Sequence, residues 1–243
     1  GLLILIPTYS SAPAALRGIE DLLSDSVAVR RTASSLATSI CCAAAAAICA
    51  LGIASRLSPD LRGRQRILAV ISGCLLLPGL AGPLILSLGL QTLFQLPLLR
   101  PAWDTMLPQL LGQILWLLPR AFAAAQLLWT EERSESLHAA SLLLQAADSR
   151  QRRTAAGLIW RLQDLPLTVA LLVLTHWAFW DVTTASLLHP VTFEPIVTRL
   201  YNEMHFARTE ALLGLTALSI STPAVCLTVV GTVAFVFRLF RRQ

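Results

Sequence analysis

Histidine and acidic side chains are the groups that could do chemistry inside a membrane, and the apolar stretches of this chain hold few of them. His176 lies in the stretch that follows Asp164, and Asp181 ends that stretch. An ionisable residue at or near membrane depth is costly to bury and is therefore a candidate functional residue. Asp181 is thus expected to line the outer mouth of a path through the membrane.

Two tryptophans and one arginine accompany this candidate. Trp177 and Trp180 precede Asp181 within one helical turn. They either line the same path or belong to the aromatic belt at the membrane interface. Arg120 stands inside another apolar stretch, where snorkelling of its guanidinium to the lipid headgroups is the simpler interpretation.

A second group of titratable residues falls outside the apolar stretches. Without HxxH or HxxxE spacing on a clear helix, these residues do not predict a metal site, and we interpret them as solvated external charge. They are His189, Glu194, Glu203, His205 and Glu210.

Known catalytic signatures are missing from the sequence. It contains no phosphate-binding loop, nucleophile elbow or zinc-helix motif, and its five cysteines lack metal-ligand spacing. We therefore expect no catalytic residue, no metal and no cofactor in this chain. A membrane-embedded enzyme would need a cluster of His, Asp or Glu within its helices, and the apolar stretches provide only His176 and Asp181.

The elements that must position these residues follow from the spacing of charge. All 19 basic residues are arginine, and they leave uncharged windows at 32–55, 67–99 and 211–237. Because a helix rises about 1.5 Å per residue, roughly 20 apolar residues cross a hydrocarbon core of about 30 Å. A mean hydropathy of +0.66 with 14% charged residues excludes a soluble or disordered chain. The sequence predicts a polytopic membrane protein.

The predicted fold is all-α, a membrane helical bundle with a cytoplasmic loop. Residues 1–7 are expected to be the end of a truncated helix, a stub left from a longer parent protein. An external amphipathic connector follows through residue 31, either as an interfacial helix or as an ordinary link. The membrane domain then covers 32–243. Its five complete transmembrane helices are predicted at about 32–55, 67–96, 107–129, 164–182 and 210–237.

Arginine counts predict the orientation of these helices. The links 56–66 and 130–163 and the C-terminal tail together hold twelve arginines, against six on the other side. By the positive-inside rule the richer side is the cytoplasm. Topology therefore explains the net charge of +5 better than nucleic-acid binding does. Arg30 and Arg31 stand on the wrong side of this scheme.

The segment 67–96 contains two prolines and two glycines close together, at Pro78, Gly79, Gly82 and Pro83. Proline removes a backbone donor and clashes with the preceding turn, so this helix should kink or break. Broken helices are tolerated at membrane depth where they line a cavity or pack inside protein. A lipid-facing kink is the alternative.

The link 130–163 is predicted to contain helix rather than loop. Leu137, Ala140, Leu144 and Ala147 recur at helical spacing, and Arg150 to Arg153 predict a basic elbow before a second short helix. A short amphipathic element held at the cytoplasmic face between two membrane helices is typical of a docking element.

Here the sequence resembles the permease subunits of binding-protein-dependent ABC importers, most closely the iron(III)/thiamine type. Their coupling loop has the form Glu-Ala-Ala, three residues, Gly, nine residues, Ile, one residue, Leu-Pro. Ser136-Leu-His-Ala-Ala-Ser-Leu-Leu-Leu144 matches it in Ala139 and Ala140, and Leu165-Pro166 matches its closing pair. The loop is degenerate, because His138 replaces the glutamate, Leu144 replaces the glycine, and the closing pair comes too late.

The flanking segments carry the same resemblance. The stretch 77–90 is similar to the Pro/Gly-rich third helix of these permeases, and 177–190 and 193–201 are similar to the external segments that follow. The resemblance covers nearly the whole chain. It implies a subunit of the bacterial inner membrane that forms a translocation path for a solute, with iron(III) or thiamine-type compounds the best guess.

The resemblance also implies partners and site residues. A cytoplasmic ABC-type ATPase, a second permease half and an external solute-binding protein would complete the transporter in the lipid membrane. A scaffold or sensor derived from a permease, without transport, is the alternative that the degenerate loop suggests. The expected ATPase-coupling residues are Leu137, His138, Ala139, Ala140, Leu143 and Leu144, and the expected path residues are Pro78, Gly79, Gly82, Pro83, Trp177 and Asp181.

Overall fold

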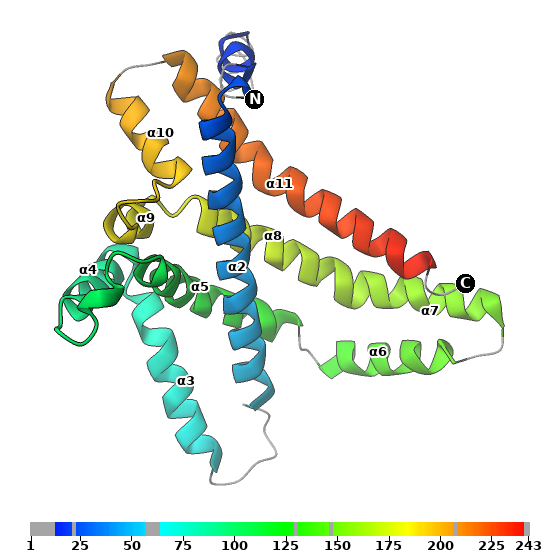
Figure 1. Cartoon of the computed structure of the whole chain (residues 1–243). Helices are drawn as coiled ribbons and strands as arrows, with labels where there is room; N and C mark the ends of the chain where they lie inside the picture. The colour runs from blue at the N-terminus through cyan, green and yellow to red at the C-terminus, as the bar shows by residue number, and fades with distance from the viewer. Residues whose placement is uncertain are drawn as a thin grey trace, which may run out of the picture.

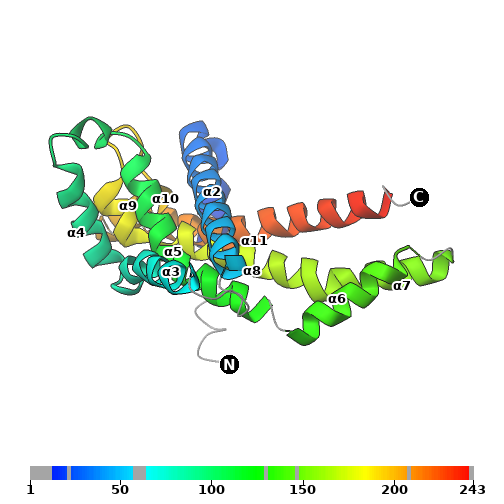
Figure 2. The same cartoon turned by 90° about the horizontal axis from the view of Figure 1, so that it is seen from below.

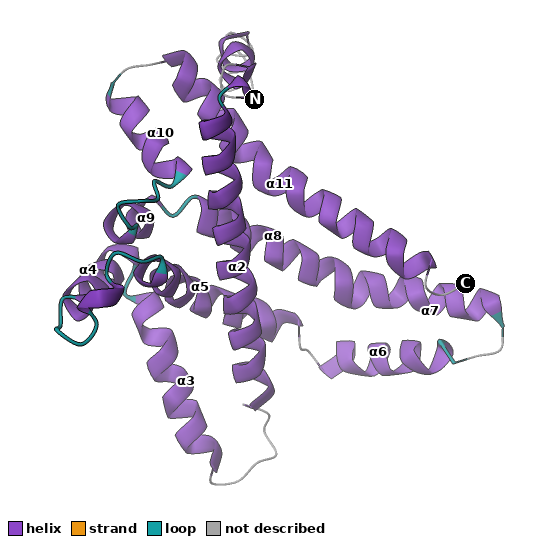
Figure 3. Cartoon of the chain, viewed as in Figure 1, coloured by secondary structure: helices purple, strands orange, loops and turns teal. Residues whose placement is uncertain are grey.

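The computed structural model describes residues 13–20, 23–56, 64–128, 131–145, 148–206 and 209–240. Within these ranges all regular elements are helical, which confirms the predicted all-α class (Figure 3). The predicted stub at residues 1–7 lies outside them. The longer elements are α2 (Ser26–Arg56), α3 (Arg64–Leu80), α4 (Pro83–Phe94), α5 (Leu107–Leu128), α6 (Glu131–Leu143), α7 (Ser149–Ile159), α8 (Leu165–Phe179), α9 (Val182–Leu188), α10 (Ile196–His205) and α11 (Thr209–Phe240).

Three helices in the described part of the chain are long and apolar enough to cross a membrane. They are Ser26–Ala54, Leu107–Leu128 and Arg150–Phe179, and the bent pair Val70–Leu80 and Pro83–Phe94 would make a fourth. Within α11 the apolar stretch Leu212–Val225 is shorter than a span. These helices support a membrane protein with three or four spans, and the fifth predicted helix at 210–237 is not among them.

The centre of the molecule is the crossing of α2 with α5 and α8 (Figure 1). One face of α2 is built from small residues, and Cys42, Ala43, Ala46 and Ala50 are fully buried against Leu117 and other residues of α5 and α8. Small side chains let helix backbones approach closely, which favours helix association in a membrane, where lipid is as apolar as leucine.

The predicted break in the segment 67–96 is confirmed. The chain turns by 106° between α3 and α4, and Gly82, which ends the bend, has φ of +93°. Side-chain-bearing L-residues rarely adopt this conformation, so glycine is needed there. Pro83 then starts α4, where its missing N–H is no loss.

The link 130–163 folds into a hairpin of α6 against α7, and both views show this hairpin to one side of the crossing of α2 with α5 (Figures 1 and 2). The predicted basic elbow at Arg150 to Arg153 is wrong. Asp148 accepts a hydrogen bond from the backbone N–H of Arg150 (2.9 Å) and caps α7. The arginines therefore lie inside the helix, and the turn precedes them.

α8 begins at Leu165 as predicted, but the short helix before it is not separate, because α7 continues into α8 through a π-helical turn, η2 (Trp160–Asp164). In this turn the N–H of Leu165 bonds to the carbonyl of Trp160, one residue further back than in an α-helix. Pro166 cannot donate to a preceding carbonyl, and a π-turn is one of the ways in which a helix passes such a residue. Arg150–Phe179 is thus one helix of 30 residues.

The connector before α2 crosses α11 at two glycines. A Cβ atom at Gly214 would overlap the backbone of Gly18, so residues 13–20 and α11 touch backbone to backbone. Leu16 and Leu23 remain exposed, at 67% and 59% of their surface. The helix is therefore packed on the bundle by its small residues while its leucines face outward.

Candidate functional site

The helix break brings α3 against α5 at two of the predicted path residues. A Cβ atom at Gly79 would overlap the carbonyl oxygen of Leu115 and the ring of Pro119. Pro78 is the residue just before this close contact, inside α3. Gly82 and Pro83 form the bend and direct α4 across α5 and α9.

Asp181 lies between the end of α8 and the start of α9. α8 stops at Phe179, and Asp181 caps the seven-residue α9 by accepting a hydrogen bond from the N–H of Thr184 through Oδ1 (3.1 Å). Only 5% of Asp181 is exposed. Its Oδ2 is buried and has no hydrogen-bond partner among the described residues.

An unpredicted polar stripe on α5 faces this break. Gln109 and Gln113 are four residues apart and are 2% and 3% exposed. The side-chain amide of Gln113 donates to the carbonyl of Ala178 (3.2 Å), and its Oε1 accepts from the thiol of Cys42 (3.3 Å). In the sequence, two glutamines four residues apart in an otherwise apolar helix could have indicated this stripe.

The Gln113 contacts also fix the level at which α8 ends. Cys42 stands close to the middle of the uncharged window of α2, and Ala178 is hydrogen-bonded to the residue that Cys42 contacts. α8 therefore ends level with the middle of α2. Two discontinuous helices, α3–α4 and α8–α9, meet at α5, and their second halves pack against one another.

Several buried polar atoms around this meeting point have no hydrogen-bond partner among the described residues. Most buried polar groups in proteins are paired, so such a cluster needs an explanation, often water or a ligand. We define the discontinuous-helix site by Trp180 and Asp181, which lie between α8 and α9, and by the residues of α4, α5 and α9 that carry the other atoms. The atoms are Ser87 Oγ, Gln109 Oε1, Trp180 Nε1, Asp181 Oδ2 and Thr184 Oγ1.

The guanidinium of Arg120 lies near the ring of Trp177, beside this site. The guanidinium of Arg120 lies 4.2 Å from the ring centre of Trp116 and 5.7 Å from that of Trp177. Its Nη1 donates to the carbonyl of Trp116 (2.6 Å), one turn earlier in α5. The side chain thus turns back along α5 toward Trp116, and its snorkelling to the lipid headgroups stays a prediction.

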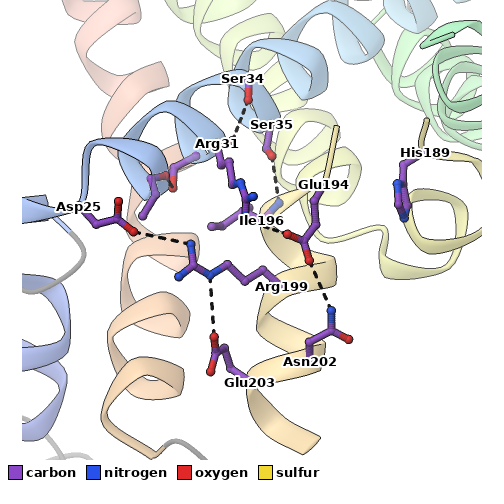
Figure 4. A network of polar contacts seen from close by, with 12 residues as sticks. Asp25, Arg31, Ser34, Ser35, His189, Glu194, Ile196, Arg199, Asn202 and Glu203 are labelled. Carbon is purple, nitrogen blue, oxygen red and sulfur yellow. Dashed lines mark hydrogen bonds and ion pairs between the residues drawn. The ribbon is translucent and has the colours of Figure 1, made fainter. Parts of the chain in front are cut away.

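At the N-terminal end of α2, a polar network joins α2 to α10 and to the segment before it (Figure 4). Arg31 donates to Glu194 Oε2 (2.8 Å), and Asn202 donates to Glu194 Oε1 (3.4 Å). Arg199 lies between Asp25 (4.0 Å) and Glu203 (3.9 Å). We call this set the outer network.

The outer network corrects the interpretation of solvated external charge. Glu194 and Glu203 take part in ion pairs, and His205 packs edge-on against Tyr201 at 4.5 Å between ring centres. The side chain of Glu210 lies outside the described part. Among described residues no group of three or more His, Cys, Asp or Glu side chains could hold a metal ion.

Ser35 gives the outer network a buried anchor that can be tested. Its Oγ accepts a hydrogen bond from the N–H of Ile196 (3.0 Å), and Ile196 is fully buried. Ser35→Ala should cost about 1–3 kcal/mol because a buried donor is left unpaired. Thermal unfolding in detergent should show a Tm lowered by about 2–4 °C per kcal/mol.

The neighbouring Ser34 is the control for this prediction, because its Oγ donates only within α2, to the carbonyl of Arg31. Ser34→Ala should leave the Tm unchanged or slightly raised. An equal loss of stability in both variants would mean that the Ser35–Ile196 bond contributes nothing specific.

The predicted coupling residues lie on and just after α6, where they divide into two groups. His138, Ala139 and Leu143 are exposed, and Leu137 and Leu144 are partly buried. Ala140 is 1% exposed, and Ala155 of α7 is fully buried. Ala140 therefore belongs to the interior of the hairpin, while His138 and Ala139 are open to a partner.

No family model matches this chain, and no curated protein matches it. The geometry of the site and the sequence resemblance are the grounds for a function.

Proposed function

We propose that the chain is the permease subunit of an ABC-type importer in a bacterial inner membrane. The bent pair and α11 would complete five spans with α2, α5 and α8. A cytoplasmic ATPase, a second permease half and an external solute-binding protein would act with it, and iron(III) or a thiamine-type compound is the solute class that the resemblance favours.

One observation carries this proposal. The hairpin of α6 and α7 continues without a break into the helix that ends beside Asp181. A displacement imposed on the hairpin by a partner would therefore reach the discontinuous-helix site through one rigid element. Coupling of this kind requires a two-state element that the partner biases, and a helix packed between α2 and α5 supplies it.

The discontinuous-helix site supports a transport role for the same chain. Broken helices near the middle of a membrane are typical of substrate sites in transporters, since their freed backbone groups and buried polar atoms can contact a solute. Asp181, Gln109 and Thr184 provide such atoms here. These residues are proposed to line the path with Trp177.

The test of ATPase coupling uses Ala139, which is exposed on α6. The protein is purified in mild detergent together with the products of its neighbouring genes, and the bound subunits are identified by mass spectrometry. A stoichiometric ABC-type ATPase is expected. Ala139→Glu should abolish its recovery, because a buried unpaired charge in an interface costs several kcal/mol.

Two further variants make this result specific. Thr154→Glu adds the same charge at an exposed position of α7 and should leave the ATPase bound. Ala140→Glu should open the hairpin and abolish recovery for a structural reason, visible as faster proteolysis between α6 and α7. If no ATPase is recovered with the folded wild-type protein, the importer function is wrong.

The alternative of a permease-derived scaffold or sensor rests on the degenerate coupling sequence at His138 and Leu144. It predicts a folded membrane protein in which Ala139→Glu has no effect on any partner. The same co-purification distinguishes the two functions.

A further inference from the structure

Two clefts lie on the outer face on either side of the Arg31–Glu194 ion pair. Their volumes are about 520 Å³ and 640 Å³, and they share Arg31, Glu194 and Asn202. Small-molecule sites commonly have volumes of about 300–1,000 Å³. The larger cleft is therefore of a size that fits a small solute, and we call it the outer cleft.

The outer cleft is built from segments distant in sequence. α2 contributes Arg30, Arg31 and Ser34, the segment between α9 and α10 contributes His189 and 191–194, and α10 contributes Thr198 and Asn202. The hydrogen bond of Ser35 to the N–H of Ile196 holds these segments together beneath the cleft (Figure 4). The lining is thus fixed by the fold.

The charge of the lining is positive. Glu194, its single carboxylate, is neutralised by Arg31 at 2.8 Å, and its second oxygen accepts from Asn202. Arg30 is exposed and makes no ion pair with a described residue. An arginine on the outer side opposes the topology rule that the twelve arginines of the opposite side follow. The ion pair with Glu194 explains why Arg31 lies on this side, whereas no ion pair with a described residue explains the position of Arg30.

The cleft also offers neutral donors and an apolar wall. The hydroxyl of Thr198 is buried and has no hydrogen-bond partner among the described residues, and Thr192 adds a second hydroxyl. Val191 and Phe193 line the same space, and Val191 is 90% exposed. A guanidinium beside hydroxyl donors matches an oxyanion, and the two apolar side chains match a hydrocarbon group attached to it.

We propose that the outer cleft binds a small organic carboxylate, with the carboxylate on Arg30 and the Thr198 hydroxyl and its apolar body against Val191 and Phe193. The oxyanion chemistry is shared by free phosphate and by lipid headgroups, and the apolar wall favours the organic acid. Binding at the outer cleft does not require an ATPase. A negative binding result would therefore leave the importer proposal unaffected, and the reverse also holds.

The test is isothermal titration of the full chain, purified in a neutral detergent, with sodium butyrate as the probe. Sodium phosphate, sodium chloride and a short-chain phosphatidylglycerol are titrated in parallel, so that the cation stays constant. One butyrate per chain is expected to bind. Arg30→Gln should weaken binding at least tenfold, the usual loss for one charge-assisted hydrogen bond of about 1.5–3 kcal/mol.

Two other variants separate the cleft from general charge and from misfolding. Arg100→Gln removes an exposed arginine of the outer side that does not line the cleft, and should leave the affinity unchanged. Thr198→Val keeps the charge and the shape and should weaken binding by a smaller factor.

Three results would overturn the proposal. The first is a folded protein that binds no butyrate, and the second is equal loss in Arg30→Gln and Arg100→Gln. The third is tighter binding of inorganic phosphate or phosphatidylglycerol than of butyrate, which would assign the cleft to phosphate or lipid instead.

Discussion

Replacing Gly79 with alanine is expected to destabilise the protein by roughly 1–3 kcal/mol or more, the usual range for overpacking a close contact. The new Cβ atom would overlap the carbonyl oxygen of Leu115 and lie 2.7 Å from Cδ of Pro119. Neither atom belongs to a flexible side chain, so α3 would have to move away from α5. The measurement is thermal unfolding in detergent, followed by tryptophan fluorescence.

Gly73 gives a matched control on the same helix. No atom lies within 4 Å of a Cβ built at this position. Gly73→Ala should therefore be neutral or stabilise the protein by up to about 1 kcal/mol, because alanine has the higher helix propensity. If Gly79→Ala behaves like Gly73→Ala, the close contact between α3 and α5 is not present in the folded protein.

Asp181→Asn should leave the fold intact and remove the function proposed for the discontinuous-helix site. Asparagine can still accept the hydrogen bond from Thr184 and cap α9. It also removes a carboxylate that is 5% exposed, so stability should stay the same or rise. Solute-stimulated ATPase activity of the assembled complex should fall by roughly tenfold or more, as for loss of one charge-assisted contact.

Asp181→Ala separates the structural role of this residue from the functional one. It loses the cap as well as the charge, and should cost about 0.5–2 kcal/mol in addition to the loss of activity. Full activity of the Asp181→Asn complex would show that Asp181 is a helix cap alone. That result would leave the importer function standing, with a path that runs elsewhere.

Local backbone chemistry made the broken helix predictable. The run from Pro78 to Pro83 contains the residues that a helix cannot accommodate without a bend, and the break at Gly82 follows from that run alone. Asp181 was singled out in the same way, because it ends an apolar stretch that also holds His176. Both signals lie within a few residues of the feature that they predict.

Features that depend on contacts between distant segments could not be predicted. Glu194 and Arg31 are 163 residues apart, and nothing in the sequence near either residue indicates that they pair. The burial of Ala140 depends on the partner helix α7, so Ala139 and Ala140 looked equivalent before folding. The continuity of α7 with α8 was not predicted, because Leu165-Pro166 is also a good helix N-terminus and the π-turn before it has no clear sequence signal.

The long helix Arg150–Phe179 has a mechanical consequence. At 1.5 Å per residue it measures about 45 Å, and its buried contacts with α2 and α5 lie near one end, at Leu174 and Ala178. A force on the far end of this helix would turn it about these contacts, which lie close to Asp181. The arm from Leu174 to Arg150 is about 36 Å and the arm from Leu174 to Phe179 about 8 Å, so a shift of about 5 Å at the hairpin becomes about 1 Å at the inner end. In the proposed importer, a large displacement of the hairpin would therefore become a smaller displacement with a larger force beside Asp181. Such a motion suits the separation of a tightly packed junction rather than the carrying of a group across the membrane.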